Sequence, residues 1–325
     1  MRRALLALLA LIIAGALAFH LLTMPATVPA SALPAHTPDL ANGKYMFTVG
    51  GCAECHAVPL KKCDDLKTKE KDVLAGGRCL KTPFGVFHVP NISPDKETGI
   101  GNWTTVDFVN AMKHGIGPGG EHLYPAFPYF SYQRMTYEDL IDLKAYLDTL
   151  PAVKNEVPPH ELSFPFNIRR GLGLWQILYV DGKSFTPDAK ANAELNRGAY
   201  LVMGPGHCAE CHSSRNILGG IVQGTAFAGA KNSEGKGTVP QYHAERRRHR
   251  RLERGRHCLP PRDGEHARFR CDRREYGSCT GEYGEAHTRG PQSHRCVYQV
   301  AAAPARRCPQ VRTEKERGKD QRVRK

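Results

Sequence analysis

The chain begins with a long apolar stretch. Two arginines precede residues 4–22, a run of nineteen residues interrupted only by glycine and His20, and a segment rich in Pro, Ala and Ser follows. The run lies within the roughly 17 to 25 residues of a membrane-spanning helix and exceeds the roughly 7 to 15 of a signal-peptide core. We expect residues 1–35 to form an uncleaved anchor that leaves the body outside the cytoplasm. The small residues at 30–32 offer the alternative, a cleavage site that would release a soluble form.

Two later segments have the periodicity of amphipathic helices. One covers about Thr105–His114, and the other covers about Tyr137–Leu150, where leucines recur at 3- and 4-residue intervals. Thr136 is placed to cap the second helix, and Asp139 stands at its capping-box position. The sequence therefore predicts that both segments pack on a common core.

A third helical pattern occurs twice. Its first copy follows Thr37 and Pro38, which suit the N-cap and N1 positions, and its second copy begins at Ala193. Each copy contains a glycine followed two positions later by a tyrosine: Gly43 with Tyr45, and Gly198 with Tyr200. A glycine here permits the close approach of another helix. The repetition predicts two related units.

These patterns divide the chain into five parts. The anchor of residues 1–35 is followed by a first domain over 36–152 and by an interdomain linker over 153–190. A truncated second domain covers 191–240, and a basic tail covers 241–325. The linker is too apolar to run free in solvent, and we expect it to pack along the seam between the domains. The predicted fold class is all-α, with tandem domains.

The net charge of +14 belongs almost entirely to the tail. Residues 241–325 contain 23 of the 46 Lys and Arg and 11 of the 32 Asp and Glu, which gives +12. The tail also contains no Ile or Met, so it cannot bury enough apolar surface to offset the ordering of its backbone. We expect it to be disordered. An exported protein meets no nucleic acid, so a nucleic-acid partner is not expected.

The tail begins where the resemblance between the two units ends. Val239-Pro240 still matches Val89-Pro90, but nothing after it resembles the first unit. Codons chosen for residue 241 onward and shifted by one base can restore the Asn-Ile-Ser-Pro and Gly-Ile-Gly-Asn-Trp text of the first unit. We therefore suggest a reading-frame change near codon 240, with a natural basic tail as the alternative. The DNA sequence at this codon decides between them.

The same five residues, Cys-Ala-Glu-Cys-His, occur at 52–56 and at 208–212. Two thiols and an imidazole at this spacing are typical of c-type haem attachment, in which the cysteines bind the porphyrin and the histidine binds the iron. A redox dithiol and a zinc site are the alternatives, but each cysteine pair has its own histidine. The predicted cofactors are two covalently bound haem c. The predicted attachment residues are Cys52, Cys55 and His56 in the first copy, and Cys208, Cys211 and His212 in the second.

A sixth iron ligand determines whether a haem carries electrons or binds small molecules. For the first haem we favour Met135, because it follows a Pro-rich loop and directly precedes the last helix. Met112 is the alternative inside a helical pattern, where methionine is usually core filler. His114 and His122 are further alternatives. His/Met coordination leaves the iron no vacant position, so this haem should pass electrons.

The second unit offers no distal methionine, since the last one in the chain, Met203, precedes its haem motif. The tail residues His243, His249 and His257 could bind only adventitiously, because a disordered segment must lose entropy to do so. We expect a five-coordinate or mis-ligated second haem. Separately, Cys63 and Cys79 flank a lysine-rich insertion, and in an oxidising compartment they could form a disulfide, with free thiols as the alternative.

The two haem motifs, the segments Tyr124–Tyr129 and Ser131–Met135, and the Asn-Ile-Ser-Pro element give the chain a family resemblance over about residues 38–240. It resembles the membrane-anchored c-type cytochromes that serve as electron-accepting subunits of bacterial periplasmic dehydrogenases for alcohols, aldehydes or sugar acids. The resemblance implies class I cytochrome c domains and a distal ligand at Met135. The chain departs from that family in having two haem motifs where three are common.

The resemblance implies a periplasmic electron carrier at the inner membrane, held there by its N-terminal helix. A dehydrogenase would be its donor, and an oxidase or another component of the respiratory chain its acceptor. Nothing between the motifs resembles a substrate pocket, so we expect no catalytic residues. A dihaem enzyme, such as a peroxidase or a thiosulfate-oxidising cytochrome, and a haem-based gas sensor are the alternatives.

Overall fold

The structure is a computed structural model that describes residues 1–65, 67–68, 70–232 and 237–242. Its helices are α1 (Arg2–Leu22), α2 (Leu40–Val49), α3 (Cys52–His56), α4 (Thr105–His114), α5 (Tyr129–Tyr132), α6 (Tyr137–Leu147), α7 (Leu172–Tyr179), α8 (Ala193–Met203) and α9 (Ala209–His212). Its strands are β1 (Cys79–Thr82), β2 (Gly85–His88), β3 (Glu161–Leu162), β4 (Ala230–Lys231) and β5 (Thr238–Val239). The expected disorder of the tail and the reading-frame hypothesis concern residues that lie outside this description.

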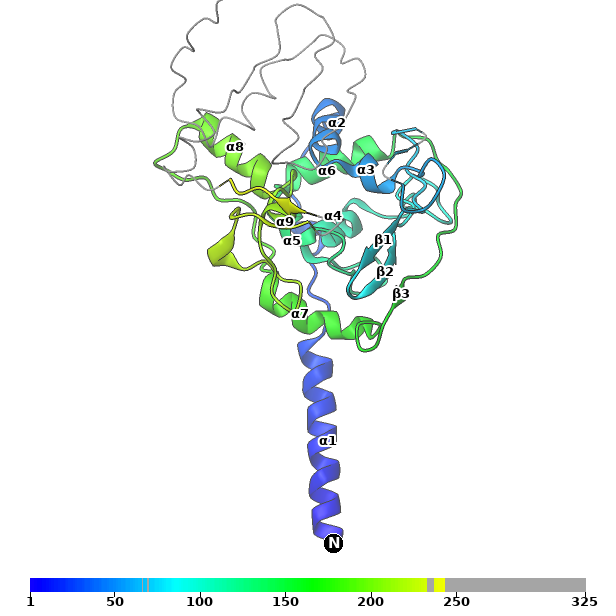
Figure 1. Ribbon diagram of the computed structural model, residues 1–325, viewed down its shortest axis with the longest axis vertical. Helices are drawn as coiled ribbons and strands as arrows, with labels where there is room; N and C mark the ends of the chain where they lie inside the picture. Colours follow the sequence, from blue (N-terminus) through cyan, green and yellow to red (C-terminus); the bar gives the residue numbers. More distant parts are fainter. Residues whose placement is uncertain (66, 69, 233–236, 243–325) are drawn as a thin grey trace, which may run out of the picture.

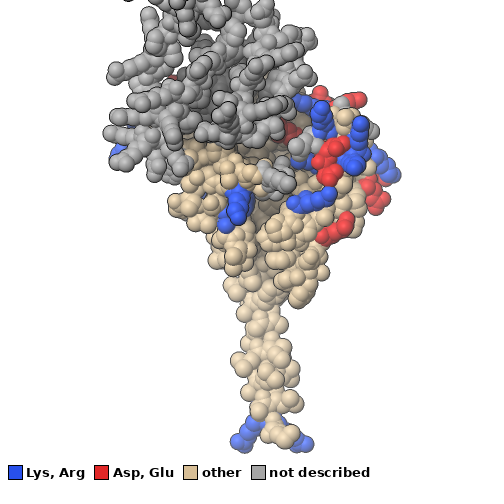
Figure 2. Space-filling view, viewed as in Figure 1, with Lys and Arg blue, Asp and Glu red and all other residues tan. Residues whose placement is uncertain are grey.

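Helix α1 projects from the head of the molecule as a straight shaft (Figure 1). None of its residues is buried, and it is long and apolar enough to cross a membrane. Figure 2 shows charged side chains at the N-terminal end of the shaft and on the head, and none between. These features fit a membrane anchor.

The shaft joins the head at Thr23, which is completely buried. The side chain of Arg170 donates from Nε to Thr23 Oγ1 at 2.8 Å, and His122 Nε2 lies 2.9 Å from the Thr23 carbonyl oxygen. The junction is therefore a packed contact and not a loose connection.

The core of the head forms where α2 crosses α6. At the crossing, a Cβ atom added to Gly43 would lie 2.1 Å from the carbonyl oxygen of Asp142, so only glycine allows the two backbones to approach this closely. This confirms the role predicted for Gly43. The apolar cluster beneath the crossing draws on α2, α3, α4 and α6 and includes Met46, Val109 and Leu140.

The helix ends match the sequence closely but not everywhere. Helix α4 has the predicted bounds, and the Thr136 side chain accepts the amide of Asp139 at the start of α6, as expected. Helix α2 is capped by Asp39 and not by Thr37, because the Asp39 carboxylate accepts the amides of Ala41 and Asn42, the second and third residues of the helix. The carboxylate of Asp139 does not bond back to Thr136, whose amide binds Tyr200 Oη at 3.2 Å instead.

The all-α prediction holds for the helical core and is wrong for the loops between its helices. Strands β1, β2 and β3 form an antiparallel sheet, and β4 pairs with β5. A Cβ atom on Gly85 would lie 2.2 Å from the carbonyl oxygen of Glu161, so this glycine lets β3 approach β2. The pairing joins residues about 75 positions apart, and a local pattern could not reveal it. A disulfide joins Cys63 to Cys79, as expected.

The segment between the two units packs against both of them. The amide of Phe185 donates to the Arg134 carbonyl at 2.9 Å, and the Phe185 ring lies 5.9 Å from the ring of Tyr200 in α8. In α7, the ring of Trp175 meets that of Tyr129 edge-on at 5.9 Å. These contacts hold the second cysteine-histidine motif beside the first unit.

Candidate functional site

The first cysteine-histidine motif occupies one short helix directly after α2. Gly51 adopts φ 57°, a left-handed conformation that turns the chain from the end of α2 into α3. Cys52, Cys55 and His56 then lie within five consecutive helical residues. The structure therefore brings the three predicted attachment residues together. The second motif repeats this arrangement, with Cys208 preceding α9 and His212 ending it.

Both motif histidines are oriented by the same kind of bond. His56 Nδ1 lies 2.9 Å from the carbonyl oxygen of Pro90, and His212 Nδ1 lies 2.8 Å from the carbonyl oxygen of Pro240. A carbonyl can only accept, so Nδ1 carries the proton and Nε2 keeps the lone pair that binds a metal. Burial lowers the pKa of His56 and favours the neutral form that a ligand needs.

The cysteines do not have the properties of a redox dithiol. Burial raises the pKa of Cys52 to about 12, and burial also raises the pKa of Cys208. Reactive dithiols have lowered pKa values, so Cys52 and Cys208 lack the thiolate character of a redox-active pair. Within the described part of the chain, no three His, Cys, Asp or Glu residues are grouped so as to hold a metal ion. Neither alternative to haem attachment finds support here.

The first motif faces an apolar cluster that contains both candidate methionines. Met135 is 1% exposed and Met112 is 5% exposed, and the two belong to the same cluster as Ala53 of α3. Met135 lies in the short connection between α5 and α6, whereas Met112 lies inside α4. His122 is committed elsewhere, because both of its ring nitrogens lie within 2.9 Å of oxygen acceptors.

A buried lysine holds the backbone around Met135. Lys113 Nζ donates to the carbonyl oxygens of Gln133 at 2.6 Å and Met135 at 2.9 Å, and to Ser184 Oγ at 2.9 Å. Burial, followed by the nearby charge of Arg134, lowers the pKa of Lys113 to about 8, which leaves the ammonium form dominant at neutral pH. Sequence reasoning missed this residue, because a lysine in an amphipathic helix is normally assigned to the solvent face.

A second buried cation stands beside the first motif. Arg78 is 6% exposed, and its Nη1 donates to the Glu54 carbonyl at 2.9 Å and lies 3.5 Å from Cys55 Sγ. Such a group can neutralise an acid on a molecule bound next to Cys55. Sequence reasoning missed it as well, since Arg78 follows two glycines in a loop that carries no motif.

The second motif is less enclosed than the first. Cys211 is exposed, and the ring of His212 lies 4.3 Å from that of Tyr242. Between this motif and residue 242 the described chain contains no methionine. The tail histidines His243, His249 and His257 lie outside the described residues, so the ligation of the second iron stays a prediction.

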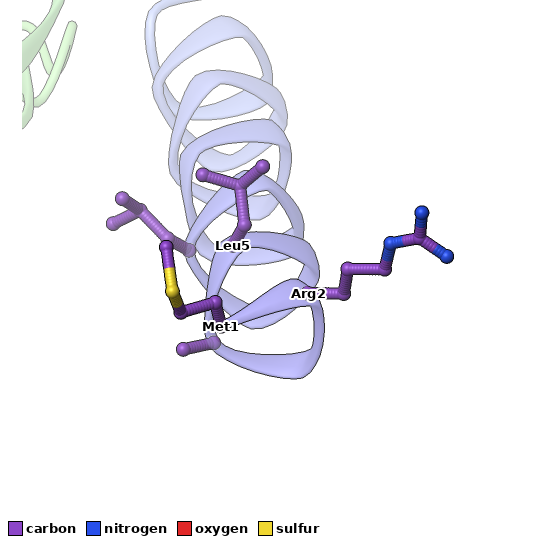
Figure 3. Close-up of a pocket in the computed structure, with 5 residues that line it drawn as sticks. Met1, Arg2 and Leu5 are labelled. Carbon is purple, nitrogen blue, oxygen red and sulfur yellow. The ribbon is translucent and has the colours of Figure 1, made fainter.

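A surface hollow at the other end of the molecule has no chemistry to offer. It is lined by Met1, Arg2, Ala4, Leu5 and Leu8 on the exposed N-terminal turns of α1 (Figure 3). These side chains include no acid, base or nucleophile beyond a solvent-facing guanidinium. The hollow is therefore not a candidate substrate site.

Comparison with known proteins agrees with this geometry. Residues 40–151 match the family model for Cytochrome c. The chain is 45% identical over 240 residues to a diheme cytochrome c-type protein of Cereibacter sphaeroides, a match that covers 74% of this chain and 79% of the relative.

Two further relatives are parts of dehydrogenases. The chain is 40% identical over 204 residues to the fructose dehydrogenase cytochrome subunit of Gluconobacter japonicus, which covers 62% of this chain and 40% of that one. It is 37% identical over 191 residues to the cytochrome c subunit of a quinone-type alcohol dehydrogenase of Gluconacetobacter polyoxogenes, which covers 56% of this chain and 38% of that one. The chain thus spans less than half the length of either of these two relatives.

Proposed function

This chain belongs to the dihaem c-type cytochromes, and from that premise we propose that it is the membrane-anchored electron-transfer subunit of a periplasmic dehydrogenase. Its cofactors are two covalently bound haem c, and it transfers electrons without being a catalytic subunit itself. The fructose and alcohol dehydrogenase relatives are cytochrome subunits, which gives no support to the dihaem peroxidase or thiosulfate-oxidising alternative.

One observation carries the assignment of the haem sites. In both units a proline carbonyl holds the Nδ1 atom of the motif histidine, at 2.9 Å for His56 and 2.8 Å for His212. Two independent loops reach the same arrangement, which prepares Nε2 of each imidazole to bind iron. We therefore assign one haem to each unit, and a tandem arrangement of haem-binding domains follows.

The chain's own residues have distinct tasks around the first haem. A haem supplies an iron that gains and loses one electron. Cys52 and Cys55 would hold the first haem through thioether bonds, with His56 as its proximal ligand and Met135 as its distal ligand. The buried guanidinium of Arg78 suits a haem propionate. The surrounding apolar cluster excludes water from the first haem site. This exclusion and the thioether ligand Met135 would both raise the reduction potential of that haem.

The N-terminal helix supplies the location. Helix α1 would span the inner membrane, and the charged head would lie on the periplasmic side, with the two N-terminal arginines left inside. Electrons would pass from a dehydrogenase through the two haems to a respiratory acceptor. The relatives named for fructose and alcohol dehydrogenases support a donor that oxidises small organic molecules.

The test uses membranes that contain the full chain. Alcohols, fructose and gluconate are added in turn, and the reduction of haem c is followed by absorption. We expect one of these substrates to reduce the haem c of wild-type membranes. In membranes that carry the C52A/C55A variant, which lacks the first haem, the same substrate should leave the remaining haem oxidised. Haem that dithionite reduces but no dehydrogenase substrate reduces would contradict the proposed partner.

A further inference from the structure

The segments that lead into the two haem-attachment motifs meet in the folded chain. His207, the residue before Cys208, places its Nε2 atom 3.1 Å from the carbonyl oxygen of Gly50, which lies two residues before Cys52. Since a carbonyl accepts, Nε2 is the donor. A second contact lies close by, where Ser131 Oγ donates to Glu210 Oε1 at 2.7 Å. The peptide that holds one haem is therefore hydrogen-bonded to the peptide that holds the other.

The segment before the second motif packs against Gly50. A Cβ atom on Gly50 would lie 3.6 Å from the Pro205 carbonyl oxygen, which is an ordinary van der Waals distance. Within that segment, a Cβ atom on Gly206 would lie 2.7 Å from the carbonyl oxygen of Leu201, so glycine allows the turn that leads from α8 to His207.

His207 itself is held in a conformation that costs free energy. Its φ is 38°, in the left-handed region that residues other than glycine rarely adopt. Such a backbone is strained and persists where the surroundings impose it, often at functional positions. Here the conformation aims the imidazole back across the interface at Gly50.

An aromatic ring closes the contact. Tyr132 is 7% exposed, and its ring meets that of His207 edge-on at 5.6 Å. Burial raises the pKa of Tyr132 well above its usual range, and the thiols of Cys52 and Cys55 and the carboxylate of Glu210 act in the same direction. Tyr132 therefore stays a neutral ring, and it packs against the imidazole of His207.

We propose that His207 is a positioning residue for electron transfer between the two haems. Its hydrogen bond to Gly50 fixes the spacing of the attachment sites and completes a bonded path from Cys52, through Gly51 and Gly50, to His207 and Cys208. Without the bond, the same electron must cross a gap between the two peptides, and the spacing of the haems is less constrained. This inference rests on the two-haem electron transfer proposed above.

The test compares two variants that differ only in reach. In H207Q the amide nitrogen stands at about the position of Nε2, whereas in H207N the same amide is one methylene shorter and falls short of Gly50. Asn also tolerates the left-handed backbone, so H207N does not add strain. The variant S131A removes the neighbouring contact to Glu210 and lies off the path.

Electron transfer between the haems is measured in the full chain after photochemical injection of one electron, together with haem content and both midpoint potentials. We expect H207N to slow the transfer several-fold, while H207Q and S131A stay near the wild-type rate, with haem content and potentials unchanged in all three. Equal rates in H207N and H207Q, with two haems bound, would overturn the role of His207 and leave the proposed function standing. A wild-type protein with fewer than two haems would overturn both.

Discussion

Replacing Lys113 by methionine removes the buried charge that holds the segment around Met135. The Lys113 ammonium is completely buried and donates to the carbonyl oxygens of Gln133 and Met135 and to the hydroxyl of Ser184. Methionine has a similar length but no donor. The Ser184 hydroxyl still reaches the Met135 carbonyl at 3.1 Å, so in K113M the Gln133 carbonyl loses the most.

The magnitude follows from opposing contributions. A hydrogen bond from a charged donor contributes roughly 1.5 to 3 kcal/mol, and a buried carbonyl without a donor costs roughly 1 to 3 kcal/mol. Methionine recovers part of this, because burying an ammonium costs several kcal/mol. We expect the stabilisation of the segment around Met135 to fall by about 2 kcal/mol. Since about 1.4 kcal/mol changes an equilibrium constant tenfold, the equilibrium should shift about 30-fold toward states in which this segment is released.

The assay follows two signals of the full protein during urea titration. One is the absorption band of a methionine–iron bond, which the proposed ligand Met135 would produce, and the other is the far-ultraviolet circular dichroism of the helices. In K113M the band should disappear at a lower urea concentration than the helical signal. The control is K144M, because Lys144 is also buried but bonds to Asp148 at 2.7 Å, away from Met135. An unchanged band and an unchanged free energy of unfolding in K113M would refute the role given to Lys113.

Three further predictions concern the stability of the first domain. G43A should lower the free energy of unfolding by roughly 1 to 3 kcal/mol through overpacking against Asp142, measured by urea titration; a stabilised variant would contradict the tight crossing. Burial acts to raise the pKa of Asp142, but bonds from Asn42, the Asp39 amide and His36 outweigh it and lower the pKa. The stabilisation by the Asp142 carboxylate is present above about pH 4 and is lost on acidification. D142N should therefore have a lower free energy of unfolding than the wild-type protein at pH 7, and this free energy should fall less below pH 4; parallel plots of the two free energies against pH would argue against the role of Asp142. C63S should cost about 3 kcal/mol, and adding reductant to the wild-type protein should have the same effect, whereas insensitivity to reductant would count against the disulfide.

The sequence revealed those features that depend on neighbours along the chain. The bounds of α4, the Thr136 cap and the crossing glycine Gly43 each follow from a local pattern, namely periodicity, a side-chain acceptor before a helix, and a missing Cβ. The Cys-Ala-Glu-Cys-His motifs behave in the same way, since their three functional side chains lie within five residues. Such features need no knowledge of the tertiary fold.

Features that depend on distant partners could not be read in this way. Asp39 displaced Thr37 as the cap of α2, because its backbone amide also binds the Asp142 carboxylate at 2.7 Å, far along the chain. Strand β3 exists only because Gly85 admits it, and Lys113 is buried only because two carbonyls and a hydroxyl receive it. His207 carries no motif of its own, and its importance emerges only once Gly50 lies opposite it.

The most direct test of the account is the number of haems that stay on the chain after denaturation. The purified full-length protein is extracted with acidified acetone, and the mass of the remaining polypeptide is measured beside its haem absorption. We expect a red polypeptide whose mass exceeds that of the chain by two haems in the wild-type protein, and by only one haem in C208S/C211S. A colourless polypeptide of unmodified mass would contradict it.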